Sequence, residues 1–243
     1  IGSNYLVEAP RLIHYHGTPL TPHAELHKMA GKHFCVSFEE PRDIEWCIAH
    51  GQSVLLDNGA FSAFTKGKTV DFKAYEEWLE PYLYPPNWAI IPDVIDGSVE
   101  EQKLLLRSFR HLPKHLVAPV WHMNLSIDWL LELADTYERF CFGSSGAFWQ
   151  VGSDSWCRRA DEAWNALTLR GHKSWVHMLR GLALCGDKYP FASADSTNVA
   201  RNFKNKGAEV CPERMARRID AVQCPLTWRL KETQKDLFAK EAV

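Results

Sequence analysis

The chain has 243 residues, of which 46% are hydrophobic and 24% charged, with a formal net charge of −2 at pH 7. This length suits one large domain, and no apolar run approaches the ~20 residues of a membrane-spanning helix. The small net charge excludes a global attraction to nucleic acid but leaves room for a local basic patch. Seven scattered cysteines without a Cys-x-x-Cys pair argue against a disulfide framework and a cysteine-rich zinc site, so we expect a cytoplasmic protein.

Short apolar runs alternate with segments of helical pattern along the chain. The predicted strands are 12–16, 33–38, 53–57, 88–93, 116–122, 139–143, 174–179 and 191–195. The predicted helices are 22–30, 41–50, 71–83, 98–111, 126–137 and 154–169. Thr21 before Pro22 is a candidate N-cap, and Ser-Val-Glu-Glu at 98–101 has the pattern of a capping box.

Eight strands alternating with helices predict an α/β fold with a parallel sheet. Eight is also the number that closes a (β/α)8 barrel of the TIM type, whose usual size is ~250 residues. An open doubly wound sheet is the main alternative, but no Gly-x-Gly-x-x-Gly turn follows the first strand. Because no linker-like stretch interrupts the chain, we expect a single domain over 1–243, with a helical tail from about 208.

Polar residues follow the predicted strands at the end where a barrel places its functional groups. Aspartates follow three different strands, which predicts a charged active site there. The residues at these ends are His14, His16, Ser37, Asp57, Asp93, Asp96, Trp121, His122, the Gly-Ser-Ser-Gly loop at 143–146, His177, Arg180 and Asp195.

Each of these features also has a purely structural interpretation. The Asp-Asn-Gly sequence at 57–59 is the pattern of a hairpin turn. Asp195 could cap the next helix, Asp93 could begin a turn, and the loop at 143–146 could serve flexibility alone. Single histidines are more often structural than catalytic.

The order of these motifs resembles the tRNA-guanine transglycosylases. The resemblance is carried by Asp-Asn-Gly-Ala-Phe at 57–61, Pro-Asp at 92–93, Gly-Ser-Ser-Gly at 143–146 and Asp-Ser-Thr-Asn-Val-Ala-Arg-Asn at 195–202. In that family a similar first motif follows an early barrel strand, and a late aspartate precedes a segment rich in arginine and asparagine. The resemblance covers residues 53–207 as short motifs in the same order.

The resemblance implies a reaction that exchanges one base of a nucleic acid for another. Asp195 would be the nucleophile that attacks C1′ of a nucleotide and forms a covalent glycosyl-enzyme intermediate. Asp57 would be the general acid/base for the leaving and incoming bases. A carboxylate suits the first role because cleavage of a glycosidic bond builds positive charge on the sugar, and double displacement retains configuration, as in retaining glycosidases.

The resemblance also implies a site for the base. Asp93 would hydrogen-bond the N1 and 2-amino edge of a guanine-like base, and Phe61 would stack on its ring. Gly143 and Ser144 would supply backbone contacts. No cofactor is implied.

Two departures from the family concern its zinc module and a glutamine. The Cys-x-Cys-x-x-Cys-plus-His module of the tRNA enzymes has no counterpart here, and Trp121 or His122 stands where the fifth strand usually ends in a base-contacting glutamine. The chain is also much shorter than the tRNA enzymes. It is more similar to compact relatives without zinc, which exchange guanine in DNA for a 7-deazaguanine such as preQ0. We therefore expect DNA as the partner, with tRNA as the alternative and accessory proteins left open.

A basic segment follows the proposed nucleophile. Between 197 and 218, six basic residues (201, 204, 206, 214, 217 and 218) stand against two acidic ones (209 and 213). Arg201, Lys204 and Lys206 are the expected contacts to the phosphate backbone, although a solvated helical face would have the same composition. A base in a duplex must flip out to reach a barrel mouth, and Trp121, Phe148 and Trp149 are candidates to stack on it.

Two other functional classes stay open from the sequence. His14, His16, His122 and Asp195 are similar to the metal ligands of barrel-type amidohydrolases, in which zinc generates a hydroxide. That family's histidine at the sixth strand end and its fourth-strand lysine or glutamate are missing here. A barrel that binds nucleic acid without catalysis is the remaining alternative.

Overall fold

The computed structural model describes residues 12–181, 188–205 and 210–231. Its strands are β1 (Ile13–Gly17), β2 (His33–Ser37), β3 (Ser53–Asp57), β4 (Trp88–Ile90), β5 (Val117–Ala118), β6 (Val120–His122), β7 (Arg139–Gly143), β8 (Trp175–Met178) and β9 (Ser193–Ser196). Its α-helices are α1 (Ile44–His50), α2 (Ala60–Thr65), α3 (Phe72–Leu79), α4 (Val99–Ser108), α5 (Ile127–Thr136), α6 (Asp154–Arg170), α8 (Asn198–Asn202) and α9 (Pro212–Asp220). Three 3-10 helices are η1 (His23–Met29), η2 (Lys114–Leu116) and η3 (Gly146–Phe148).

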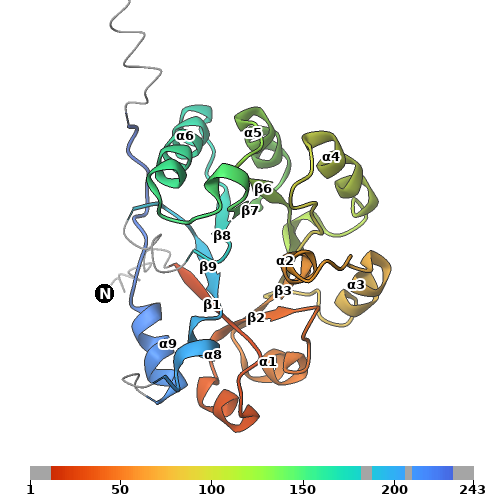
Figure 1. Ribbon diagram of the computed structural model, residues 1–243, viewed down its shortest axis with the longest axis vertical. Helices are drawn as coiled ribbons and strands as arrows, with labels where there is room; N and C mark the ends of the chain where they lie inside the picture. The colour runs from red at the N-terminus through yellow and green to blue at the C-terminus, as the bar shows by residue number, and fades with distance from the viewer. Residues whose placement is uncertain (1–11, 182–187, 206–209, 232–243) are drawn as a thin grey trace, which may run out of the picture.

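The strands form one parallel sheet that curves into a nearly closed barrel. The order is β5-β4-β3-β2-β1-β9-β8-β7-β6, so the first strand pairs with the last. The two ends of this order, β5 and β6, are separated in the chain only by Pro119, whose carbonyl accepts a hydrogen bond of 2.8 Å from the Cys141 amide of β7. Figure 1 shows the strands at the centre and helices α3 to α6 around them.

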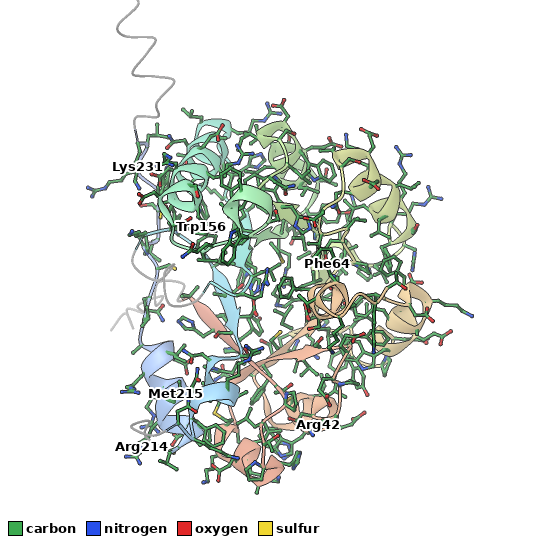
Figure 2. The ribbon with its side chains drawn as sticks, in the orientation of Figure 1. Arg42, Phe64, Trp156, Arg214, Met215 and Lys231 are labelled. Atoms are coloured by element: carbon green, nitrogen blue, oxygen red, sulfur yellow. The ribbon has the colours of Figure 1, made fainter. Side chains whose placement is uncertain are left out.

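Buried residues lie on both faces of the strands. Inside the barrel, Tyr15, Trp88 and Val120 belong to one cluster. Outside it, two larger clusters fill the space between strands and helices, and Trp156 of α6 belongs to one of them (Figure 2). Neighbouring residues of a strand point alternately into the barrel and toward the helices, so apolar side chains cover both faces of these parallel strands.

The prediction of an α/β parallel fold is confirmed, with differences at particular elements. The predicted strand 116–122 is divided into β5 and β6, because Pro119 has no N–H to continue a ladder. The helix predicted over 22–30 is the 3-10 helix η1, and its N-cap is Pro22 rather than Thr21. The capping box of α4 is confirmed by the reciprocal bonds between Ser98 and Glu101.

One structural alternative is excluded, and one prediction holds only in part. The segment after residue 57 is not a hairpin turn, because β3 pairs in parallel with both neighbours and Gly59, at φ +72°, leads into the short helix α2. Within the described part of the C-terminal tail, α9 is helical, whereas residues 222–231 contain no helix. Among the residues described, no helix combines the length and the apolar character needed to cross a membrane.

Candidate active site

A pocket of about 780 Å³ lies at the carboxyl ends of the barrel strands. Since all strands are parallel, their ends meet at one mouth, and the polar residues that follow them converge. Of the predicted site residues, the lining includes Asp57, Phe61, Asp93, His122, Gly143, Ser144, Asp195 and Arg201.

Asp57 is the last residue of β3 and accepts a hydrogen bond from the Gly59 amide at 3.2 Å. Burial, with the nearby negative charge of Asp195, raises the pKa of Asp57 from 3.8 to about 7. Hydrogen bonds from Ser37 and Gly59 oppose this rise, and Asp93 adds to it. At neutral pH this carboxyl group can therefore both give and take a proton.

Asp93 is held by two side chains from different strand ends. Its Oδ1 accepts a hydrogen bond of 2.9 Å from Asn58 Nδ2, and its Oδ2 accepts one of 2.8 Å from His122 Nε2. Asn58 also donates to the Ile91 carbonyl at 3.0 Å. Asp93 is thus fixed in orientation, and each oxygen keeps a further lone pair for a ligand.

Asp195 lies in β9 and does not cap α8, whose N-cap is Thr197. Its Oδ1 accepts hydrogen bonds from His177 Nε2 at 3.2 Å and from the Arg180 amide at 3.0 Å. Both described hydrogen bonds therefore involve the same oxygen, and Oδ2 is the one available to a substrate.

Phe61 on α2 carries the guanidinium of Arg180 over its ring, 3.5 Å from the centroid. Arg180 has a left-handed backbone, with φ +56°. Burial lowers the pKa of this guanidinium, while the charges of Asp195, Asp57 and Asp93 oppose the shift. The pocket thus joins the guanidinium of Arg180, an aromatic face and the carboxylates of the three aspartates, and Phe61 remains 44% exposed.

The loop at 143–146 closes another side of the pocket. A Cβ at Gly143 would lie 2.9 Å from Val120 and 3.2 Å from Nδ1 of His122, so only glycine fits beside that ring. Ser144 Oγ accepts a hydrogen bond of 3.0 Å from Trp156 Nε1. This contact with α6 fixes the loop, which argues against a purely flexible role.

Some predicted residues lie away from the pocket. Trp121 points outward, where its Nε1 donates to the Ser126 carbonyl at 3.1 Å, so its neighbour His122 takes the position inside the barrel. Lys204 is exposed but outside the pocket lining, and Lys206 lies outside the described residues. Trp149 is also exposed and does not line the pocket.

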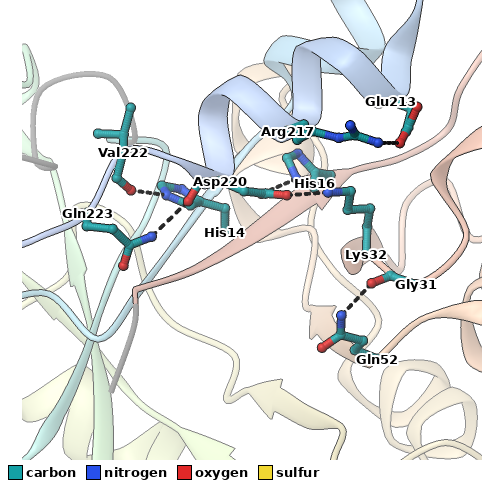
Figure 3. Close-up of polar contacts among 10 residues, drawn as sticks. All are labelled: His14, His16, Gly31, Lys32, Gln52, Glu213, Arg217, Asp220, Val222 and Gln223. Atoms are coloured by element: carbon teal, nitrogen blue, oxygen red, sulfur yellow. Dashed lines mark hydrogen bonds and ion pairs between the residues drawn. The ribbon is translucent and has the colours of Figure 1, made fainter. Parts of the chain in front are cut away.

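His14 and His16 lie on the outer face of β1 and hold the C-terminal segment (Figure 3). His14 Nε2 is 2.7 Å from the Val222 carbonyl, and His16 Nε2 is 2.9 Å from Asp220 Oδ1. The set of His14, His16, His122 and Asp195 is therefore not brought together. Within the described part of the chain, no group of three or more histidine, cysteine, aspartate or glutamate residues could hold a metal ion.

Asn58, His177 and Arg180 belong to the site but were not assigned a role from the sequence. Asn58 follows Asp57 directly, and an amide after a strand-end carboxylate is the signal that could have suggested it. His177 was named as a strand-end residue but given no role, because single histidines are more often structural than catalytic, and it is fully buried.

Comparison with known proteins finds no matching family model, no matching curated protein and no matching solved structure.

Proposed function

We propose that this protein is a base-exchange transglycosylase that replaces guanine in a nucleic acid, preferably DNA, with a 7-deazaguanine such as preQ0. The observation that carries this proposal is the convergence of Asp57, Asp93 and Asp195 from three strands on one pocket beside Phe61. The motif resemblance assigns a different role to each aspartate, and the surroundings of the three differ. Asp57 has a raised pKa, Asp93 accepts hydrogen bonds on both oxygens, and Asp195 accepts them on one oxygen.

The same proposal includes a (β/α)8 barrel of the TIM type. If β5 and β6 are counted as one strand interrupted at Pro119, the sheet has eight strands. The position of the pocket at their carboxyl ends agrees with that fold.

In the proposed first step, Oδ2 of Asp195 forms a bond to C1′ of the target nucleotide while the bond from C1′ to the base breaks. The electron pair of the broken bond goes to the base, which receives a proton from Asp57. The pKa of about 7 for Asp57 supports this role, because the group is half protonated near neutral pH.

In the second step, the incoming base gives its proton to Asp57 and attacks C1′ with its ring nitrogen. The ester bond to Asp195 breaks, which restores the free carboxylate. Two displacements at one carbon retain its configuration.

The proposed recognition of the base depends on Asp93 and Phe61. Asp93, which is held from two sides, presents acceptors to the N–H groups of a purine edge. Phe61 supplies an aromatic face. Arg201, which is exposed and lines the pocket, would contact a phosphate of the nucleic acid.

The test is incorporation of labelled guanine and preQ0 into duplex DNA and tRNA. We expect label in DNA with the wild type and a loss of more than about a thousandfold with Asp195→Ala. Asp96→Ala is the matched control, because Asp96 is an exposed aspartate near Asp93 that does not line the pocket.

Other outcomes correct the proposal in defined ways. Label in tRNA instead of DNA would change the substrate. Exchange at the wild-type rate by Asp195→Ala would remove the nucleophile assignment. Binding of nucleic acid without any exchange would favour the non-catalytic barrel.

A further inference from the structure

A chain of buried hydrogen bonds leads from the barrel interior to Asp195. Trp175 Nε1 lies 2.9 Å from Ser193 Oγ, the same Oγ lies 2.8 Å from His177 Nδ1, and His177 Nε2 lies 3.2 Å from Asp195 Oδ1. His177 and Ser193 are each 0% exposed. The bond between Ser193 and His177 is therefore shielded from solvent, whereas Trp175 is half-buried and Asp195 lines the pocket.

The chemistry of these four groups determines which one donates and which one accepts in each hydrogen bond. An indole N–H can only donate, so Ser193 Oγ accepts the hydrogen bond from Trp175. A carboxylate can only accept, so His177 carries its hydrogen on Nε2. In the tautomer with its hydrogen on Nε2, the ring has a lone pair on Nδ1, which accepts the hydroxyl hydrogen of Ser193.

The ring of His177 is also fixed by packing. It lies edge-on to Trp88, with centroids 5.2 Å apart, and edge-on to Tyr15 at 6.0 Å. Because both neighbours belong to the apolar cluster inside the barrel, the imidazole has little freedom to turn away from Asp195.

We propose that His177, oriented by Ser193 and Trp175, is a positioning residue that holds Asp195 Oδ1 and sets how long the covalent intermediate lasts. This inference rests on the proposed function. The bond at Oδ1 leaves Oδ2 to attack. Once Oδ2 is esterified, Oδ1 becomes the ester carbonyl oxygen and keeps its donor.

The effect on rate follows from charge. A hydrogen bond to a carboxylate is stronger than one to a neutral ester carbonyl. The donor therefore stabilises the carboxylate that departs in the second step more than it stabilises the intermediate. Loss of the donor should slow breakdown of the intermediate, so that the covalent adduct accumulates.

The experiment measures the lifetime of the covalent adduct and kcat in three variants. His177→Leu removes the donor, and we expect a lifetime about 10 to 100 times longer, with kcat lower by a similar factor and no rise in KM. His177→Gln keeps an N–H donor and should recover most of the loss. Ser193→Ala removes only the partner of His177 Nδ1, so its adduct lifetime should lie between those of the wild type and His177→Leu.

His33→Gln is the matched control, because His33 Nδ1 also pairs with a serine, Ser53, at 2.7 Å but is not hydrogen-bonded to any aspartate in the described structure. Equal losses in His177→Leu and His33→Gln without adduct accumulation would overturn the positioning role. A wild-type adduct lifetime in His177→Leu would do the same.

A second measurement separates this inference from the proposed function. Nitrogen-15 NMR of labelled histidine should find His177 in the wild type with hydrogen on Nε2 and a hydrogen-bonded Nδ1. A ring with hydrogen only on Nδ1 would overturn the chain of bonds. A wild type that forms no adduct, yet has the expected tautomer, would count against the transglycosylase while leaving the arrangement of His177 supported.

Discussion

Asp57 illustrates how the pocket assigns different chemistry to residues of one type. Asp93 has hydrogen-bond donors on both oxygens, and Asp195 has two donors on one oxygen. Asp57 also accepts hydrogen bonds from Ser37 and Gly59, but its burial and the charges of the other two aspartates outweigh them. Negative charges close together cannot all stay ionised at neutral pH. The proton is therefore expected on Asp57, the residue with a raised pKa.

The first prediction concerns the pH dependence of base release. In the proposed mechanism Asp57 must be protonated to give a proton to the departing base, and its pKa is about 7. We expect the rate of adduct formation to be level below pH 7 and to fall about tenfold per pH unit above it. In Asp57→Asn this inflection should vanish and the rate should drop by about 10² to 10⁴. A persisting inflection in rapid-quench measurements on the variant would assign the titration to another group.

The raised pKa of Asp57 also predicts how the stability of the folded protein depends on pH. The pKa of Asp57 is raised in the folded state, so the folded protein binds more protons between about pH 4 and 7, and its stability falls as pH rises through that window. Asp57→Asn should therefore be more stable than the wild type at pH 8, by roughly 1 to 3 kcal/mol, with a smaller difference at pH 4. Urea unfolding at the two pH values measures this, with Asp96→Asn as the exposed control. A less stable variant at pH 8 would contradict it.

Among the helices, α4 offers the clearest local test. Ser98 accepts a hydrogen bond of 3.3 Å from the Glu101 amide, and Glu101 Oε2 accepts one of 2.8 Å from the Ser98 amide. Ser98→Ala should lower the free energy of unfolding by about 1 kcal/mol in urea denaturation. Glu101→Gln should have a smaller effect, because glutamine also completes a capping box. Equal losses in both variants would show that charge near the helix start matters more than the cap.

At the scale of strands and helices, the sequence predicts where the strands end but not which side chains point into the barrel. The carboxyl-end aspartates were predictable, because a polar residue directly after an apolar run marks the end of a buried strand. The facing of His14, His16, Trp121 and His177 was not predictable. Both faces of a barrel strand are apolar, so alternation does not distinguish inside from outside. The short helix α2 was missed because Asp-Asn-Gly before it also signals a turn.

Across the whole molecule, α9 connects the C-terminal part of the chain to the first strand. Asp220 accepts hydrogen bonds from His16 at 2.9 Å and from Lys32 at 2.6 Å. Gln223 accepts one of 2.8 Å from the Leu12 amide. In Figure 1, α9 lies beside α8, which follows the proposed nucleophile, so this attachment supports the side of the barrel that carries Asp195.

The last prediction concerns this attachment. Burial alone would raise the pKa of Asp220, but the bonds to His16 and Lys32 outweigh it and lower the pKa. Because the folded-state pKa lies below the unfolded value, the stabilisation is complete above about pH 5 and is lost as pH falls through the folded-state pKa. Asp220→Asn should cost about 1 to 3 kcal/mol at pH 7, since it weakens two charge-assisted bonds, and the difference from the wild type should shrink toward pH 3. Asp135→Asn, which breaks more exposed ion pairs with Arg170 and His172, should cost less than about 1 kcal/mol. An Asp220→Asn effect as large at pH 3 as at pH 7 would mean that packing of α9, rather than the charge of Asp220, holds the C-terminal segment to β1.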